Sequence, residues 1–396
     1  MPRSSLLCAF LVVFLDLVGV GMLVPVLPYY AQSMGAHGWE LGLLVSLFTL
    51  VQFAAIPFWG KFSDRVGRRP VLVMSLLGSS LALVILMLSG SLHWIFISRI
   101  IAGCFAATVS LSYAYIADVT EPAERGKGLG MISAGIGLGI TFGTVIGGLL
   151  ARYGFWLPLS AAALLGVFNA VFVFFKVEET RQSREVRRSH RIRVFELKVF
   201  RNLLHETSIR NAAVGFFLVI SALTSMEVVV AIYLAARYQF NAESTGVLLA
   251  VAGLARLMIQ GNLYNRIIGQ MGEIKILIVG AIFGSFSLVL IGSATSVYLT
   301  ASGILFLAMA QGVLTPALSR AAALGAPVQR RGASMGMLQL ISAISRILLA
   351  PIAGYLYDTM SWRSPFYIGS VAMGLTFVVG VIWLFSANQA PSPYLE

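Results

Sequence analysis

The chain has 396 residues, of which 58% are hydrophobic and only 11% are charged. An average soluble domain is about 25% charged, so this composition excludes a soluble globular protein and predicts a protein with many membrane spans. The net charge of +12 raises the question of a nucleic-acid partner, but the placement of the basic residues argues against one.

Twelve apolar runs are each long enough for a transmembrane helix, which needs about 20 residues. The sequence therefore predicts an all-α membrane protein with twelve transmembrane helices. The first run contains Asp16 and two prolines and has no small-residue cleavage site after it, so we interpret it as a retained helix rather than a signal peptide. In chain order, the runs span residues 7–30, 39–59, 70–89, 93–116, 129–151, 155–175, 211–236, 244–265, 274–293, 297–320, 333–357 and 364–386.

The basic residues are distributed unevenly between the loops. Most of the 28 Lys and Arg residues lie at the N-terminus or in loops that follow even-numbered runs. The loops after odd-numbered runs contain only Arg152, Arg237 and Arg363. By the positive-inside rule, this asymmetry predicts that both termini and the central loop are cytoplasmic, and it accounts for the net charge without a nucleic acid.

Residues 176–210 interrupt the hydrophobic pattern with many charges of both signs. Six runs precede this segment and six follow it. We therefore predict an N-terminal six-helix bundle at residues 1–175, a basic cytoplasmic linker, and a C-terminal six-helix bundle at residues 211–396. The linker is either an amphipathic segment on the membrane surface, in contact with anionic lipid, or a solvated connection.

The two halves share short motifs at a nearly constant offset, which indicates a duplication. Residues 261–266 (GNLYNR) resemble residues 60–65 (GKFSDR), and residues 331–337 share Arg, Gly, Gly and Met with residues 125–131. Duplicated bundles predict a substrate path where they meet, near the bilayer midplane.

The strongly basic turn at residues 60–70 joins the second and third runs. Asp64 can bond the exposed N–H groups at the start of a neighbouring helix, and Arg65 or Arg69 can pair with an acid such as Asp118 or Glu121. We expect these groups to form a latch between conformational states; alternatively, the basic residues only enforce topology. Because Asn265 replaces the acid in the second copy, latching by charge should be stronger in the first half. The expected latch residues are Gly60, Asp64, Arg65, Gly67, Arg68, Arg69 and Asp118.

Asp16 and Glu227 are the only acidic residues deep within apolar runs. An ionisable group at that depth costs about 2.5–3.5 kcal/mol on insertion scales, which makes it a functional candidate. A desolvated carboxyl group can load and release a proton near neutral pH. We therefore predict that one or both carry a coupling proton, and that Glu227 attracts a cationic substrate. The alternative is that each neutralises a membrane arginine.

Four arginines lie within or at the ends of apolar runs: Arg99, Arg256, Arg320 and Arg346. Arg99 can pair with Asp16 as a proton-sensitive switch if their helices face each other. Arg256 and Arg346 outnumber Glu227 in the second half, which favours an anionic or zwitterionic substrate. Arg320 lies near the end of its run, where snorkelling to the headgroups explains it.

Further polar and aromatic residues at membrane depth can line a wet path, although each is also typical of bonding between helices. The sequence lacks a phosphate-binding glycine loop, a metal-binding pattern of Cys or His, and a nucleophile with a nearby base. We therefore expect no ATP-driven transport, no metal or other cofactor, and no enzyme activity. The expected substrate-binding residues are Glu227, Arg256, Arg346, Gln52, Tyr113, Tyr233, Gln260, Gln311 and Gln339.

The fifth run is rich in glycine, which lets another helix approach closely. Helix packing is predicted for Gly139, Gly143, Gly147 and Gly148.

With the turn at residues 60–69, with Asp16 and its neighbouring glycines, and with Arg99 and Gly103, the chain resembles the major facilitator superfamily. The resemblance is closest to twelve-span drug:proton antiporters of the tetracycline-efflux type, and it implies two six-helix bundles and a role for Arg99 in proton coupling. The fifth run resembles the antiporter motif, but Thr144 stands where that motif has proline.

The resemblance implies export of a small amphipathic organic molecule by alternating access, in exchange for protons. It implies a monomer embedded in membrane lipid, in a bacterial inner membrane. The alternative is an exporter or facilitator of an anionic or zwitterionic metabolite, siderophore or lysolipid without strict proton coupling. A membrane sensor that keeps the fold without transport is a third possibility, which the retained buried charges disfavour.

Overall fold

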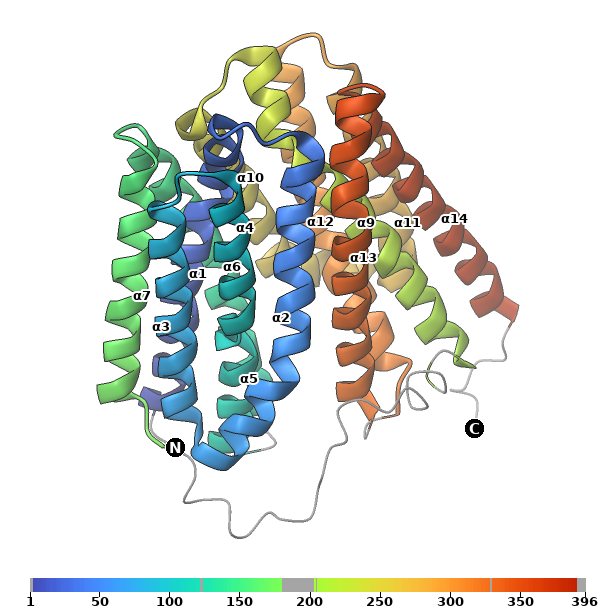
Figure 1. Ribbon diagram of the computed structural model, residues 1–396. Helices are drawn as coiled ribbons and strands as arrows, with labels where there is room; N and C mark the ends of the chain where they lie inside the picture. Colours follow the sequence, from blue (N-terminus) through green and yellow to red (C-terminus); the bar gives the residue numbers. More distant parts are fainter. Residues whose placement is uncertain (1–2, 122–123, 180–202, 204, 328–329, 390–396) are drawn as a thin grey trace. The chain divides into compact units, whose positions relative to one another are not determined.

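The computed structural model describes residues 3–121, 124–179, 203, 205–327 and 330–389 (Figure 1). Within these residues, twelve segments are long and apolar enough to cross a membrane, which confirms the predicted all-α architecture. The first half contains α1 (Arg3–Ser33), α2 (Gly38–Val66), α3 (Arg68–Met87), α4 (Leu92–Phe105), α5 (Thr108–Val119), α6 (Arg125–Ala151) and α7 (Trp156–Lys176). The second half contains α9 (Thr207–Tyr238), α10 (Ala242–Met258), the π-helical turn η2 (Ile259–Leu263), α11 (Tyr264–Ser293), α12 (Val297–Leu324), α13 (Arg331–Thr359) and α14 (Ser364–Gln389).

The contacts divide the chain into two compact units. Unit 1 contains α1 to α7 together with Ala231–Gly253, which is the end of α9 and most of α10. Unit 2 contains α9 up to Val230 and the chain from Leu254 onward. The predicted linker at residues 176–210 falls mostly outside the described residues, so the division into bundles at that linker stays a prediction.

The fourth predicted span is interrupted rather than continuous. α4 ends at Phe105 and α5 begins at Thr108, and Ala106 between them has a non-helical ψ of 64°. No proline or glycine stands at residues 106–107, so the break does not follow from local sequence. Side chains from other helices bond the backbone there, as described below.

The basic turn at residues 60–70 is not a loop. α2 continues to Val66 and α3 begins at Arg68, so Gly67 alone separates the two helices. Gly67 has a φ of +117°, a conformation that residues with a side chain rarely adopt. Gly60, by contrast, lies within α2 with nothing within 4 Å of an added Cβ, so the turn does not require it.

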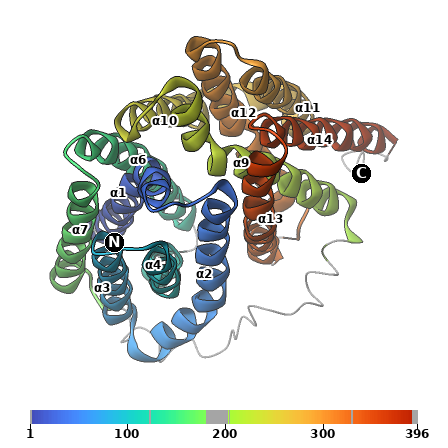
Figure 2. The ribbon, with the colours of Figure 1, turned by 45° about the horizontal axis from the view of Figure 1, so that its top comes forward.

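In unit 1, α1 packs along α6 and also contacts α7, while α3 packs against α7 and α4 (Figure 2). Four glycines, at positions 135, 139, 143 and 147, recur every four residues on the face of α6 that meets α1. A Cβ at Gly139 would lie 2.7 Å from the Phe14 carbonyl oxygen, and one at Gly143 would overlap the Val18 carbonyl oxygen. The two backbones are therefore in direct contact.

The next glycine, Gly148, faces α10 instead of α1. A Cβ at Gly148 would lie 3.0 Å from the Cα of Gly246. Nearby, the Tyr29 hydroxyl lies 2.7 Å from the Thr245 hydroxyl and donates to the Ala231 carbonyl at 3.2 Å. α1 and α6 are thus joined to the segment 231–253 within unit 1.

In unit 2, α11 packs against both α12 and α14. Ser285 of α11 bonds Ser370 of α14 at 3.0 Å between their hydroxyls, and Ser221 of α9 bonds Ser345 of α13 at the same distance. Short hydroxyl bridges of this kind satisfy polar groups where no water is present, and the second one holds α9 and α13 together next to the charged groups of this unit.

Candidate functional site

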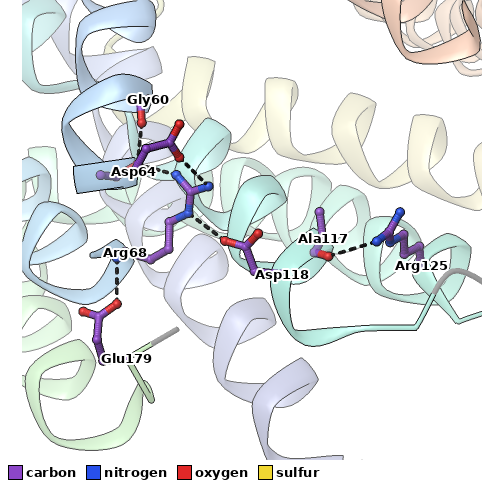
Figure 3. Close-up of polar contacts among 8 residues, drawn as sticks. Gly60, Asp64, Arg68, Ala117, Asp118, Arg125 and Glu179 are labelled. Atoms are coloured by element: carbon purple, nitrogen blue, oxygen red, sulfur yellow. Dashed lines mark hydrogen bonds and ion pairs between the residues drawn. The ribbon is translucent and has the colours of Figure 1, made fainter. Parts of the chain in front are cut away.

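An ion-pair cluster lies where α2 meets α3 (Figure 3). Its centre is Arg68, the first residue of α3, whose side chain is only 7% exposed. The guanidinium binds Asp64 through Nη2 at 3.0 Å and Asp118 of α5 through Nε at 2.9 Å. It also donates to the Ser63 hydroxyl. Three helix ends are therefore connected through one buried side chain.

The arginine that pairs with Asp118 is Arg68, not Arg65 or Arg69 as the sequence suggested. Because α2 stays helical to Val66, Arg65 remains exposed on that helix, whereas the bend at Gly67 returns Arg68 toward Asp64. Arg69 turns to α7, where its guanidinium donates to the Phe174 carbonyl and lies 4.7 Å from the centre of the Phe174 ring.

Sequence reasoning missed Glu179, which belongs to the same cluster. Its carboxylate accepts a hydrogen bond of 3.0 Å from the backbone N–H of Arg68, at the N-terminus of α3, where a negative charge is favourable. A Cβ at Gly67 would overlap this carboxylate, so Gly67 is required both for its φ and for this contact. The sequence signal that could have identified Glu179 is its position directly after the sixth run, on the same predicted cytoplasmic side as the basic turn at residues 60–70.

Unit 2 contains a counterpart of this pair with inverted charges. In unit 1, Gly67 at positive φ precedes Arg68, which binds Asp118 near the end of the next span. In unit 2, Gly272 has a φ of +73° and precedes Glu273, whose carboxylate lies 3.0 Å from Nε of Arg320 on α12.

The ion-pair counterpart lies outside the sequence match at residues 261–266, which form η2 and the start of α11, with a distorted backbone at Gly261. It also corrects one expectation. Arg320 does not merely extend to the headgroups, because it pairs with Glu273. Tyr264 is buried beside this pair, and burial raises the pKa of Tyr264 to about 12, so its hydroxyl stays protonated at neutral pH.

The pair in unit 1 is expected to contribute more stability than the pair in unit 2. Arg68 is 7% exposed, whereas Arg320 is 50% exposed and Glu273 is 29% exposed. Exposed pairs typically couple by about 0.2–1 kcal/mol, and buried hydrogen-bonded pairs couple more strongly. Double-mutant cycles on thermal unfolding, with alanine at Arg68 and Asp118 and at Glu273 and Arg320, should therefore give the larger coupling energy in unit 1. Equal coupling energies would contradict this assignment.

Asp16 of α1 faces the break in the fourth span. The hydroxyl of Thr108, the first residue of α5, lies within hydrogen-bonding reach of the Asp16 carboxyl group. Three carbonyls at the break are bonded by side chains from α2 or α3. The carbonyls of Cys104, Phe105 and Ala106 accept from Trp59, Ser75 and Gln52, respectively.

The structure does not form the pair between Arg99 and Asp16 that the sequence allowed. Arg99 is buried on α4, its Nε lies 3.5 Å from the Ser98 hydroxyl, and within the described residues its Nη2 has no partner. Asp16 is instead directed at the start of α5.

In unit 2, Glu227 of α9 and Arg346 of α13 form an ion pair of 3.0 Å between Oε2 and Nη1. Arg256 of α10 interacts electrostatically with both groups. The side chains of Glu227 and Arg346 are 41% and 35% exposed, respectively. The three ionisable residues that the sequence placed deep in the second half thus lie together.

The remaining expected substrate-binding residues are divided between the units. In unit 1, Gln52 bonds the break in the fourth span, Tyr113 lies 3.4 Å from the Ser133 hydroxyl, and Tyr233 is buried against Tyr238. In unit 2, three expected glutamines lie on η2, α12 and α13, respectively: Gln260, Gln311 and Gln339. Within the described residues, their side chains form no hydrogen bond.

The part of the chain that the structure describes contains no group of three or more His, Cys, Asp or Glu residues able to hold a metal ion.

Comparisons with known proteins agree with this architecture. The chain is 29% identical over 382 residues to the class C tetracycline resistance protein of Escherichia coli, covering 94% of this chain and 95% of the relative. It is 27% identical to multidrug resistance protein 2 of Bacillus subtilis (strain 168), covering 96% and 94%.

Among solved structures, the human organic anion transporter MFSD10 (TETRAN) matches with a TM-score of 0.71 and 25% identity, covering 96% of this chain and 100% of that one. A bacterial homologue of the human lysosomal transporter Spinster matches with a TM-score of 0.75 and 15% identity, covering 99% and 100%, and shows the fold alone. The family model described as Major Facilitator Superfamily matches residues 9–348 and 263–394. The chain therefore belongs to the Major Facilitator Superfamily of membrane transporters.

Proposed function

We propose that this transporter exports a small amphipathic organic molecule by alternating access, in exchange for protons. The observation that carries the proposal is the placement of one deep carboxyl group in each unit. Asp16 contacts the start of a half-helix, and Glu227 pairs with an arginine. Ionisable groups at such depth are costly and are typical of proton and substrate pathways.

The similarity to a tetracycline resistance protein and a multidrug resistance protein supports export. The cluster around Arg68 joins three helix ends, which suits a latch that forms in one conformational state and breaks in another. We further propose a monomer in a bacterial inner membrane, with both termini in the cytoplasm, as the positive-inside rule implies.

A second candidate is transport of an anionic or zwitterionic molecule. Two arginines, Arg256 and Arg346, accompany the single deep carboxylate of unit 2. The relative of known structure at 25% identity is described as an organic anion transporter, which supports this candidate. It changes the substrate class but not the alternating-access mechanism.

Flux in proteoliposomes tests the proposed function. The purified protein would be reconstituted with an imposed pH gradient and offered tetracycline, an amphipathic aryl sulfonate or an aryl trimethylammonium salt. We expect at least one probe to accumulate against its gradient and to stop accumulating when the pH gradient is collapsed with an ionophore. If every probe accumulates or equilibrates independently of the pH gradient, the proposed exchange for protons is wrong.

A further inference from the structure

Glu227 is exposed at a single point on a helix that is otherwise buried around it. Its side chain is 41% exposed, whereas Leu223, Thr224 and Val230, which share its helix face at spacings of three and four residues, are 1–3% exposed. A lipid-facing residue would belong to a stripe of exposed neighbours. The isolated exposure therefore indicates that Glu227 reaches an opening inside the protein rather than lipid.

The charges around this opening do not balance. Glu227 neutralises Arg346 at 3.0 Å, but Arg256 interacts with both of them and, within the described residues, has no ion pair of its own. Among the other described acids of unit 2, Glu206 and Asp358 lie near helix ends, and Glu273 pairs with Arg320. One positive charge at membrane depth thus remains without a carboxylate, which is costly unless a ligand provides the counter-charge.

The pair is held in place by its neighbours. Ser345, which precedes Arg346, is fully buried and bonds Ser221 of α9 at 3.0 Å. This bridge fixes the backbone of α13 against α9, while the charged ends of Glu227 and Arg346 remain partly exposed. The contact between the two helices is therefore buried, whereas the ion pair itself is accessible.

We propose that Glu227 is an internal counter-ion that occupies, in the unloaded protein, a site for the anionic group of the substrate, formed by Arg346 and Arg256. A carboxylate, sulfonate or phosphate on an amphipathic molecule displaces the Glu227 carboxylate from Arg346, and the planar guanidinium can bind such a group through two parallel hydrogen bonds. The proposal rests on the proposed function only in taking this cluster as the place where substrate binds.

A consequence concerns the two deep acids. The anionic group of the substrate and the Glu227 carboxylate compete for the same guanidinium of Arg346, so Glu227 selects the charge of the substrate. The proton that is exchanged for substrate is then assigned to Asp16, the deep acid of unit 1.

Binding to the purified protein in phosphatidylcholine nanodiscs tests this inference without requiring transport. The probe is an aryl sulfonate, which stays ionised at neutral pH. We expect Glu227→Gln to bind it about tenfold more tightly than the wild type, because the competing carboxylate is gone; this is the size of effect that one charge-assisted hydrogen bond provides. Arg256→Gln should lose most of the affinity.

The matched control is Glu273→Gln, which removes the other glutamate paired to an arginine at 3.0 Å in unit 2 and should leave the affinity unchanged. A sulfonate affinity that is unaffected by Glu227→Gln in a folded sample would overturn the proposal. An aryl trimethylammonium salt of the same scaffold should bind more weakly than the sulfonate, and the reverse order would also overturn it, even if a variant fails to fold.

Competition by added phosphatidylglycerol would identify a lipid headgroup as a source of the anionic group, and its absence would identify a free amphiphile. If binding follows these expectations while no proton-driven flux is found in proteoliposomes, the anion site stands and the proposed exchange of protons fails. If proton-driven flux is found and sulfonate binding does not depend on Glu227, the proposed exchange of protons stands and the anion site fails.

Discussion

Replacing Gly143 by alanine is expected to destabilise the protein by about 1–3 kcal/mol, the usual cost of overpacking a close-packed site. The added Cβ would overlap the Val18 carbonyl oxygen and would lie 2.9 Å from the Cα of Gly21. Both obstacles are backbone atoms, so no side chain can move to make room, and α1 and α6 must separate. We expect a lower melting temperature in detergent and a loss of transport in proteoliposomes.

The same helix offers a matched control. Gly130 also lies in α6, and nothing lies within 4 Å of an added Cβ at that position. Alanine there removes only the conformational freedom of glycine, so Gly130→Ala should be neutral or stabilising by up to about 1 kcal/mol. Equal melting temperatures for the two variants would show that α1 and α6 are not in direct backbone contact.

Replacing Asp16 by asparagine is expected to abolish accumulation of substrate against its gradient. One proton exchanged per substrate can support an accumulation of about tenfold per unit of pH difference. Asparagine keeps the size of the side chain and its contact with Thr108 but cannot carry a proton. Substrate should therefore still equilibrate across the membrane of proteoliposomes, whereas the imposed pH gradient should no longer raise its internal concentration.

Asp16→Glu retains the titratable group and serves as the control. It should keep a response to the pH gradient, with a rate altered by the longer side chain next to α5. Accumulation by Asp16→Asn equal to that of the wild type would show that the exchanged proton is carried elsewhere, and Glu227 would then be the next group to examine.

Helix number and helix packing were accessible from the sequence, because both depend on local patterns. Apolar runs of sufficient length predicted the twelve spans. The glycines of α6 recur at helical spacing, which indicates a packing face, but their partner is set by tertiary structure: Gly143 meets α1, whereas Gly148 meets α10. A pattern within one helix cannot identify the helix that lies opposite.

The ion pairs were less predictable, because each depends on where a helix bends. Arg68, rather than Arg65 or Arg69, meets Asp118 because α2 remains helical up to Gly67. In unit 2, the pair between Glu273 and Arg320 was hidden because its charges are inverted relative to the first half and its glycine lies outside the matching motif.

The break in the fourth span was not predictable from its own residues. Its freed carbonyls are bonded by Gln52, Trp59 and Ser75, which lie on two other helices. Tertiary bonds from these helices satisfy polar groups that the interruption frees.

The central claim is that one transport cycle exchanges a proton for a substrate molecule, and proton movement driven by substrate tests it most directly. Proteoliposomes would contain a pH-sensitive dye and no imposed pH gradient, and a substrate gradient would then be applied with any probe that the flux experiment has identified. The claim predicts that protons move opposite to the substrate in the wild type and not in Asp16→Asn. Substrate movement in the wild type without any change of internal pH would contradict it.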